Sequence, residues 1–184
     1  MKVTEIDLSG VRVVEPKLFE DGRGYFVETY NQRRYVEAGI ETTFVQDNMS
    51  RSTQGTLRGL HYQVTRPQAK LVWAVEGEIV DVVVDVRRGS PTFGAHRMIR
   101  LDGTSKRQLF VPAGFAHGFC VLSDIAVVQY KCSDFYDPQD EAGVAYDDPE
   151  LGIDWPVESP LLSAKDRGLP TLADAVLPET SFVP

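Results

Sequence analysis

The sequence is poor in cysteine and has no long apolar run. Its two cysteines, Cys120 and Cys132, cannot form the framework of several disulfides that holds small secreted domains together. Both lie in apolar or strand-like surroundings, so we expect reduced core thiols in a reducing compartment, the cytoplasm. No stretch reaches the ~18 unbroken apolar residues of a membrane span. Residues 1–7 alternate and carry acids, unlike the apolar core of a signal peptide.

Positive charge is also in short supply. The chain has 19 Lys and Arg against 27 Asp and Glu, a formal net charge of -8. Such a surface repels nucleic acid and anionic membranes, so we expect neither as a partner. Any site for an anion must therefore be local.

Several catalytic motifs are missing as well. The sequence has neither a P-loop nor a strand-linked Gly-x-Gly-x-x-Gly, which leaves nucleotide hydrolysis and dinucleotide binding without support. It has no Gly-x-Ser-x-Gly turn, and neither cysteine has an evident basic partner in a loop. Acid and base chemistry without a cofactor is the class that remains.

The dominant pattern that is present has a period of two residues. In residues 79–86, Val80, Val82 and Val84 share one face, whereas Asp81 and Asp85 share the other, and which face lies inside stays open. Similar short runs, separated by Gly, Pro, Asp and Ser turns, occupy residues 71–75, 98–101, 108–111, 118–122 and 126–131. Short strands at this spacing predict an antiparallel sandwich or barrel.

Helical signals are few. Asn31 can cap a short helix over residues 32–38 that stops at Gly39, and residues 172–176 are a second candidate. The length of 184 residues suits one domain. We expect a single domain over residues 1–184, with the proline-dotted segment 154–184 packing on the barrel as an arm, and we assign nothing to residues 177–184.

Two histidines lie on or beside predicted strands. His61 lies in the block Arg58 to Gln63, and His117 lies in the block Pro112 to Phe119. A small barrel has room for side chains or one small ligand, so both imidazoles are candidates for its interior, with Arg58 and Lys70 close by in sequence. This points to proton chemistry on an anionic substrate. The alternative is that each histidine is a hydrogen-bonded structural residue.

A metal site is the first functional alternative. Metal-binding barrels of this type often carry His-x-His, but here the block is His61-Tyr62-Gln63, so the second ligand position is a glutamine. The only other histidine, His96, lies near a Gly-Pro-rich turn, where we expect a surface role. Since metal sites need three or four donors, we expect no metal and no cofactor.

Seven blocks of the sequence carry a resemblance to a known family: residues 21–26, 44–48, 57–63, 68–70, 85–94, 112–119 and 162–166. Among them, Arg-Gly-Leu-His followed by Pro-x-Gly-x-x-His is strongly specific. The blocks occur in the order found in the dTDP-4-dehydrorhamnose 3,5-epimerase family, which the chain resembles over nearly its whole length. The resemblance implies an all-β, metal-free cupin-type jelly roll that acts as a homodimer on dTDP-4-dehydro-6-deoxy-D-glucose.

The resemblance also implies roles for individual residues. The C4 ketone of the substrate acidifies the hydrogens on C3 and C5, so His61 is implied as the base and Asp166 as the carboxylate that orients it. Tyr130 is implied as the acid on the other face, and Lys70 as the group that stabilises the enolate. From the residues alone, a core role for Tyr130 and a surface role for Lys70 stay open.

The nucleotide half of the substrate needs cations and a flat surface. By resemblance Arg23 and Arg58 contact the substrate, and Tyr136 stacks on thymine. Asp81 and Asp85, if they point inward, are candidates to hold Lys70 or His61. Met49 departs from the family, since some members have histidine there. Further implied binding residues are Glu28, Gln46, Asn48, His117, Glu141 and Lys165.

Three other functions stay open beside the double epimerase. Relatives that epimerise only C3 or only C5 keep the same types of histidine, lysine and tyrosine. A non-catalytic jelly roll that binds a carbohydrate or nucleotide sugar would need no acid and base. A metal-dependent cupin oxygenase would contain bound metal. We favour the double epimerase of dTDP-L-rhamnose biosynthesis.

Overall fold

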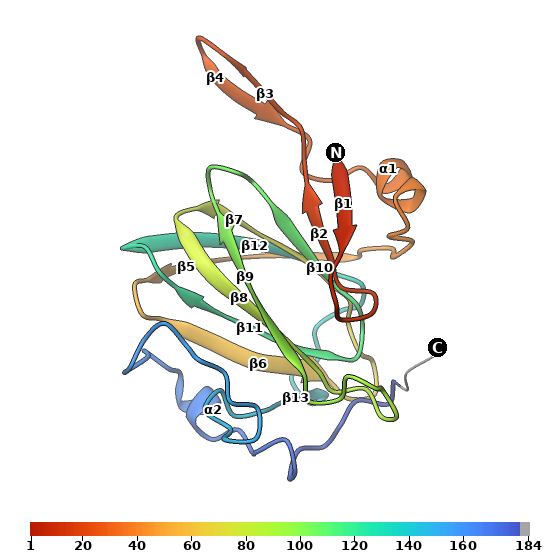
Figure 1. Ribbon diagram of the computed structural model, residues 1–184, viewed down its shortest axis with the longest axis vertical. Helices are drawn as coiled ribbons and strands as arrows, with labels where there is room; N and C mark the ends of the chain where they lie inside the picture. The colour runs from red at the N-terminus through yellow and green to blue at the C-terminus, as the bar shows by residue number, and fades with distance from the viewer. Residues whose placement is uncertain (181–184) are drawn as a thin grey trace.

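The computed structural model describes residues 1–180 and consists mainly of antiparallel strands in two facing sheets (Figure 1). One sheet has six strands in the order β1-β2-β10-β7-β12-β5, and the other has five in the order β13-β6-β11-β8-β9. The first contains β1 (Lys2–Glu5), β2 (Arg12–Glu15), β10 (Gln108–Val111), β7 (Lys70–Glu76), β12 (Ile125–Cys132) and β5 (Gln46–Thr53). The second contains β13 (Glu141–Gly143), β6 (Leu57–Gln63), β11 (Phe115–Val121), β8 (Glu78–Asp85) and β9 (His96–Asp102). The predicted all-β jelly roll is confirmed.

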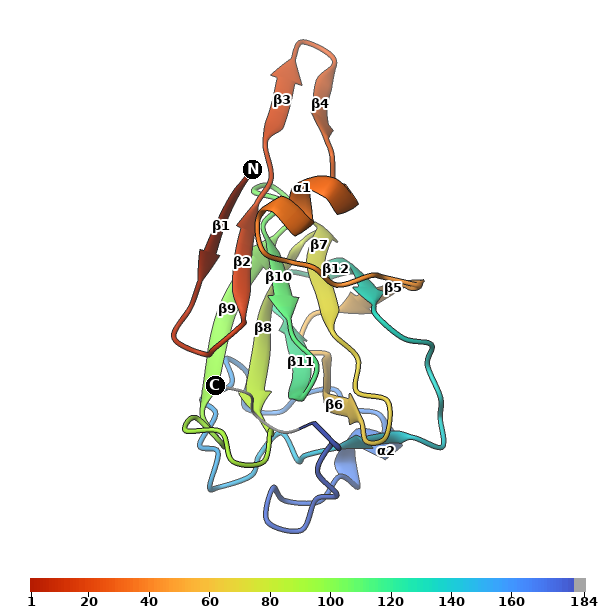
Figure 2. The ribbon, with the colours of Figure 1, turned by 90° about the vertical axis from the view of Figure 1, so that its right-hand side faces the viewer.

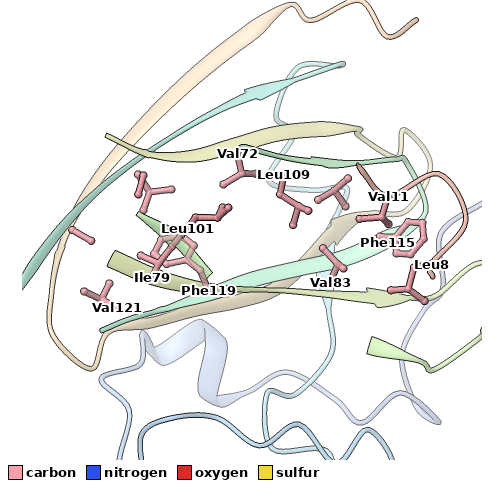
Figure 3. Packing of buried hydrophobic residues seen from close by; sticks show 14 residues of the cluster. Leu8, Val11, Val72, Ile79, Val83, Leu101, Leu109, Phe115, Phe119 and Val121 are labelled. Atoms are coloured by element: carbon pink, nitrogen blue, oxygen red, sulfur yellow. The ribbon is translucent and has the colours of Figure 1, made fainter. Parts of the chain in front are cut away.

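The main core fills the space between the two sheets. Val72 and Leu109 of the six-stranded sheet lie opposite Val83 and Phe119 of the five-stranded sheet (Figure 3). All four side chains are almost completely shielded from solvent. Burying a side chain of this kind contributes about 1.5–3 kcal/mol, so this layer holds the two walls together.

Strand β8 is buried on both faces because a further layer of chain covers its outside. Val82 and Val84 pack there against Leu172 and other residues of the C-terminal segment. Asp81 and Asp85 point inward, which answers the question that the alternating pattern leaves open. The sequence makes both carboxylates candidates to hold Lys70 or His61, but neither is hydrogen-bonded to either residue. Asp81 is bonded to His117, and Asp85 accepts bonds from Arg87, Ser90 and Thr92.

The predicted N-terminal helix is confirmed as α1 (Gln32–Glu37). The side chain of Asn31 accepts a hydrogen bond from the backbone N–H of Arg34, and Gly39 ends the helix with a φ of +83°. The left-handed conformation favours glycine at this position.

The prediction of a helix over residues 172–176 is wrong. The segment forms a turn in which the N–H of Asp174 donates to the carbonyl of Thr171, and the N–H of Leu172 donates to Asp148. The bond to Asp148 takes the N–H of Leu172 into a contact with a distant part of the chain. A different single-turn helix, α2 (Ala164–Arg167), forms nearby, where Ser163 caps it through the N–H of Asp166.

The chain after residue 154 runs along the outside of the five-stranded sheet, and α2 lies beneath β6 (Figure 1). Thr56 and Leu161 form a parallel bridge, while Trp155 and Leu162 pack against buried Leu57. These contacts fix α2 below β6. Among residues 1–180, no helix is long and apolar enough to cross a membrane.

A hairpin of β3 (Leu18–Asp21) and β4 (Gly24–Val27) projects away from both sheets (Figure 2). Its aromatic side chains Phe19, Tyr25 and Phe26 are 52%, 55% and 68% exposed. A two-stranded hairpin is marginal by itself in water, so this one needs a surface to pack on.

Candidate active site

A cavity of about 600 Å³ opens between the two sheets. Strands β5, β7 and β12 form one wall, β6, β11 and β13 form the other, and the α2 segment closes the rim. All of the predicted site residues except Arg23 and Glu28 line it: Gln46, Asn48, Arg58, His61, Lys70, His117, Tyr130, Tyr136, Glu141, Lys165 and Asp166.

His61 is held by a carboxylate that lies 105 residues further along the chain. Its Nε2 lies 2.7 Å from Oδ1 of Asp166, which is only 4% exposed. Burial would raise the pKa of Asp166, but hydrogen bonds from His61 and Ser163 and the charge of His61 hold that pKa below its usual value. Asp166 is therefore anionic at neutral pH. It fixes the ring and leaves Nδ1 with the lone pair that a base needs.

A second carboxylate, Glu141, lies on the other side of the same ring. Its Oε1 is 3.8 Å from His61 Nδ1 and 2.8 Å from Nζ of Lys165, while Tyr136 donates to its Oε2 at 2.7 Å. Burial would raise the pKa of Glu141, but the bonds from Lys165 and Tyr136 and the charge of His61 lower it. The bond to Glu141 raises the pKa of Tyr136 to about 12.

Tyr130 occupies the opposite wall. It lies on β12, paired in register with Asn48 of β5 and Val72 of β7. Burial raises the pKa of Tyr130, and Cys132 adds to this effect, while the charge of Arg58 opposes it. The phenol therefore keeps its proton at neutral pH, as a proton donor must.

Lys70 begins β7 and points into the cavity. Its Nζ donates to the carbonyl oxygen of His61 at 3.4 Å. Burial lowers the pKa of Lys70, whereas Cys132, Asp81 and Glu141 oppose that shift. A cation without a close ion pair in the described residues is suited to stabilise negative charge on a ligand.

His117 lies beside His61 on the neighbouring strand β11, and the two residues are register partners. Its Nε2 is 2.9 and 3.0 Å from the two carboxylate oxygens of Asp81, which is completely buried. The two histidines thus lie on adjacent strands, and each is paired with an aspartate from another element, Asp166 of α2 for His61 and Asp81 of β8 for His117.

Polar side chains of β5 also line the cavity. Gln46 donates to Asn48 and accepts from the backbone N–H of Tyr136, which is half exposed at the rim. Arg58 donates to Ser52 at 3.1 Å. Met49 is 65% exposed and points away from the cavity, so its departure from the family lies outside the site.

Arg23 and Glu28 lie apart from the other predicted residues. Arg23 is at the tip of the β3–β4 hairpin, where it pairs with Asp21 and its side chain is 91% exposed. Glu28 bonds to Asn31 and Arg34 beside α1. Neither lines the cavity of its own chain.

The cavity also contains residues that the sequence reasoning missed. Ser50 lines it with a buried Oγ that has no hydrogen-bond partner among residues 1–180. Cys132 is a buried thiol, as expected, but it faces the cavity and accepts from Asn48 at 3.6 Å. Every second residue in the first part of β5 lines the cavity, so the alternation Gln46, Asn48, Ser50 in the sequence could have identified Ser50. No pattern marks Cys132.

Gln63, at the position where metal-binding barrels often have a second histidine, is occupied by contacts within the protein. Gln63 uses its amide to hold backbone groups of Arg66 and Asp137. Within the described part of the chain, no group of three His, Cys, Asp or Glu residues is placed to hold a metal ion.

Comparison with known proteins agrees with this geometry. The family model for dTDP-4-dehydrorhamnose 3,5-epimerase matches residues 5–174. The enzyme of that name from Pseudomonas aeruginosa is 54% identical over 177 residues, which cover 95% of this chain and 98% of the relative. A dTDP-4-dehydrorhamnose 3-epimerase from Streptomyces niveus is 43% identical over 95% of this chain and 86% of its own length.

A solved structure gives the same result for the fold. The dTDP-6-deoxy-D-glucose-3,5-epimerase from Legionella pneumophila, crystallised with dTDP-4-keto-L-rhamnose, superposes with a TM-score of 0.95 at 45% identity. The match covers 100% of this chain and 99% of that one. On fold, length and sequence together, this chain belongs to the dTDP-4-dehydrorhamnose 3,5-epimerase family.

Proposed function

We propose that the protein inverts C3 and C5 of dTDP-4-dehydro-6-deoxy-D-glucose, giving dTDP-4-dehydro-L-rhamnose for dTDP-L-rhamnose biosynthesis. It does so with its own side chains and no cofactor. The observation that carries the proposal is the placement of a base and an acid on opposite walls of one cavity. The His61–Asp166 pair lies on the β6 side, and Tyr130 lies on the β12 side.

The reaction at each carbon follows from this placement. Neutral His61 takes the proton next to the C4 ketone, and the electron pair of the broken C–H bond moves onto the ketone oxygen. Lys70 stabilises the enolate, by about 3 kcal/mol if it acts like an oxyanion-hole donor. Tyr130 then adds its proton to the opposite face of the carbon, while Asp166 stabilises the imidazolium.

The rest of the cavity is suited to the nucleotide diphosphate. Arg58 offers a guanidinium, which can donate two bonds to phosphate oxygens. Tyr136 presents a half-exposed ring at the rim for stacking on thymine. Gln46, Asn48 and His117 supply further polar contacts along the walls.

Epimerisation of a single carbon is the second candidate. The Streptomyces niveus relative, a 3-epimerase, is 43% identical to this chain. One proton abstraction needs the same base, acid and cation as two, so these residue types do not separate the candidates. What differs is whether the sugar ring can turn between the two steps.

Nuclear magnetic resonance of the protein with dTDP-4-dehydro-6-deoxy-D-glucose in deuterated water tests the proposal. Deuterium and inversion at both C3 and C5 are expected. Label and inversion at one carbon alone would assign a single-site epimerase. No exchange at either carbon would leave a binding module, and loss of turnover in chelator would favour a metal enzyme.

We also infer that the protein works as a homodimer in the cytoplasm. The free thiols of Cys120 and Cys132 suit that compartment. The projecting hairpin exposes Phe19 and Phe26, and it carries Arg23 away from its own cavity. If the hairpin packs on a second copy, it can bring Arg23 to the diphosphate end of the partner's cavity.

A further inference from the structure

Inversion by a base on one face and an acid on the other leaves the two groups in the wrong protonation states. The C–H proton ends on His61, and the O–H proton of Tyr130 ends on the carbon. One turnover step therefore leaves an imidazolium and a phenolate. Before a second carbon can react, His61 must release one proton to solvent and Tyr130 must regain one. This requirement rests on the proposed function.

The surroundings of His61 offer two neighbours for the departing proton. Asp166 bonds to Nε2, but it is the buried residue of α2 and only 4% exposed, so it offers the proton little contact with solvent. Glu141 faces Nδ1 and contacts Lys165 and Tyr136, whose exposed fractions are 53% for the lysine side chain and 51% for the tyrosine. Of the two carboxylates that contact the His61 ring in the described residues, Glu141 is the one whose neighbours reach the exposed rim of the cavity.

We propose that Glu141 is the proton exit of the site: it accepts the proton from Nδ1 of His61 and passes it to water at the rim. The N–H bond of the imidazolium breaks, an O–H bond forms on Oε1, and a water or buffer base then removes that proton. Neutral His61 and anionic Glu141 are restored. Tyr130 takes its replacement proton separately from solvent, so one proton enters and one leaves for each inversion.

The resting distances suit this role. The 3.8 Å between Nδ1 and Oε1 exceeds the length of a hydrogen bond, so the lone pair of Nδ1 is free for the carbon proton. Once the ring is charged, a movement of about 1 Å forms the N–H···O bond. The bonds from Lys165 and Tyr136, which lower the pKa of Glu141, favour its anionic form, so the proton does not stay there.

The test replaces Glu141 with Gln, which keeps the shape but cannot carry the proton, and measures turnover by nuclear magnetic resonance. We expect kcat to fall about 10²-fold, the scale of acid-base effects, with KM changed less than about threefold. Added acetate or imidazole should raise kcat of E141Q by taking the proton directly, and should leave the wild type unchanged. Glu141→Asp should keep more activity than Glu141→Gln.

An isotope experiment in ordinary water gives a second measurement. With substrate deuterated at C5, E141Q should return more label to recovered substrate than the wild type, because the deuteron stays longer on His61. Glu150→Gln, an exposed carboxylate outside the cavity, is the control and should match the wild type.

The outcomes separate this inference from the proposed function. If wild-type protein inverts neither carbon, the proposed function fails. If the wild type is active but E141Q changes mainly KM, or shows neither buffer rescue nor added label return, Glu141 is a binding residue only and the inference is overturned. Denaturant unfolding of each variant verifies the fold, and E141D carries the comparison if E141Q is unstable.

Discussion

Among single residues, His61 has the largest predicted effect and His96 provides its matched control. Asparagine at position 61 can still bond to Asp166 but cannot act as a base. We expect His61→Asn to lower kcat about 10³-fold and to leave dTDP affinity nearly unchanged, as measured by titration calorimetry. His96 lies outside the cavity, so His96→Asn should keep full activity. Equal loss of binding and turnover in the first variant would contradict the role of His61.

Lys70 should show opposite effects on stability and activity. Its side chain is partly buried, and burial lowers its pKa against the opposing influence of Cys132, Asp81 and Glu141. Lys70→Met removes a partly desolvated charge, so we expect the free energy of unfolding to stay the same or rise by about 1 kcal/mol. The lost enolate stabilisation should lower kcat about 10²-fold. Chemical denaturation and turnover measure the two effects, and an active variant would rule out the proposed role.

The sequence predicted most of the cavity because its motifs are local. Arg58 to His61 lies within β6, and Pro112 to Phe119 comprises a short turn followed by the start of β11, which pairs with β6. Ser50 and Cys132 were missed for different reasons. Ser50 is a small polar residue on an alternating strand, whereas Cys132 has the apolar setting of an ordinary core thiol. The roles of the predicted residues stay predictions until the variants are measured.

At the scale of elements, the turn after β8 depends on one buried carboxylate. Asp85 accepts bonds from Arg87, Ser90 and Thr92. Burial would raise the pKa of Asp85, but these bonds hold it below its usual value. We expect Asp85→Asn to cost about 3 kcal/mol of unfolding free energy at pH 7, because the substitution breaks the buried ion pair between Asp85 and Arg87. Asp147 is an exposed carboxylate, so the control variant Asp147→Asn should lower the unfolding free energy only slightly.

The same carboxylate predicts a pH dependence. Because the pKa of Asp85 is lower in the folded protein than in the unfolded chain, its stabilising effect is complete above about pH 4 and is lost as the pH falls further. The difference in unfolding free energy between wild type and Asp85→Asn should therefore shrink below about pH 4. A difference that grows on acidification would contradict the assignment.

Elements with a strong local pattern were predicted, and those set by distant contacts were not. The strand pattern located β8, and the cap at Asn31 with Gly39 located α1. The inward face of β8 could not be chosen, because the C-terminal segment buries its outer valines as well. The helix expected at residues 172–176 is a turn, since Leu172 is bound to Asp148 from another part of the chain.

For the whole molecule, the proposed dimer, in which Arg23 enters the partner's cavity, predicts that two inactive chains restore each other. In a mixture of Arg23→Ala and His61→Asn subunits, exchange yields cavities that have both His61 and a partner's Arg23. We expect partial recovery of activity, up to about a quarter of the cavities in an equal mixture by random pairing. Confirmed subunit exchange without recovery would mean that each cavity is built from one chain. Whether residues 1–184 form a single folding unit also stays a prediction.

The contact between His61 and Asp166 has a consequence for how the protein is made. A ribosome completes β6 roughly a hundred residues before it reaches α2, so the base is synthesised long before the carboxylate that orients it. Strand β12, with Tyr130, is also finished first. A nascent chain stalled before residue 160 therefore carries every strand of both walls but lacks Asp166. If Asp166 has the proposed role, we expect such an interrupted product to turn over the sugar poorly, so that activity appears only when translation is nearly finished.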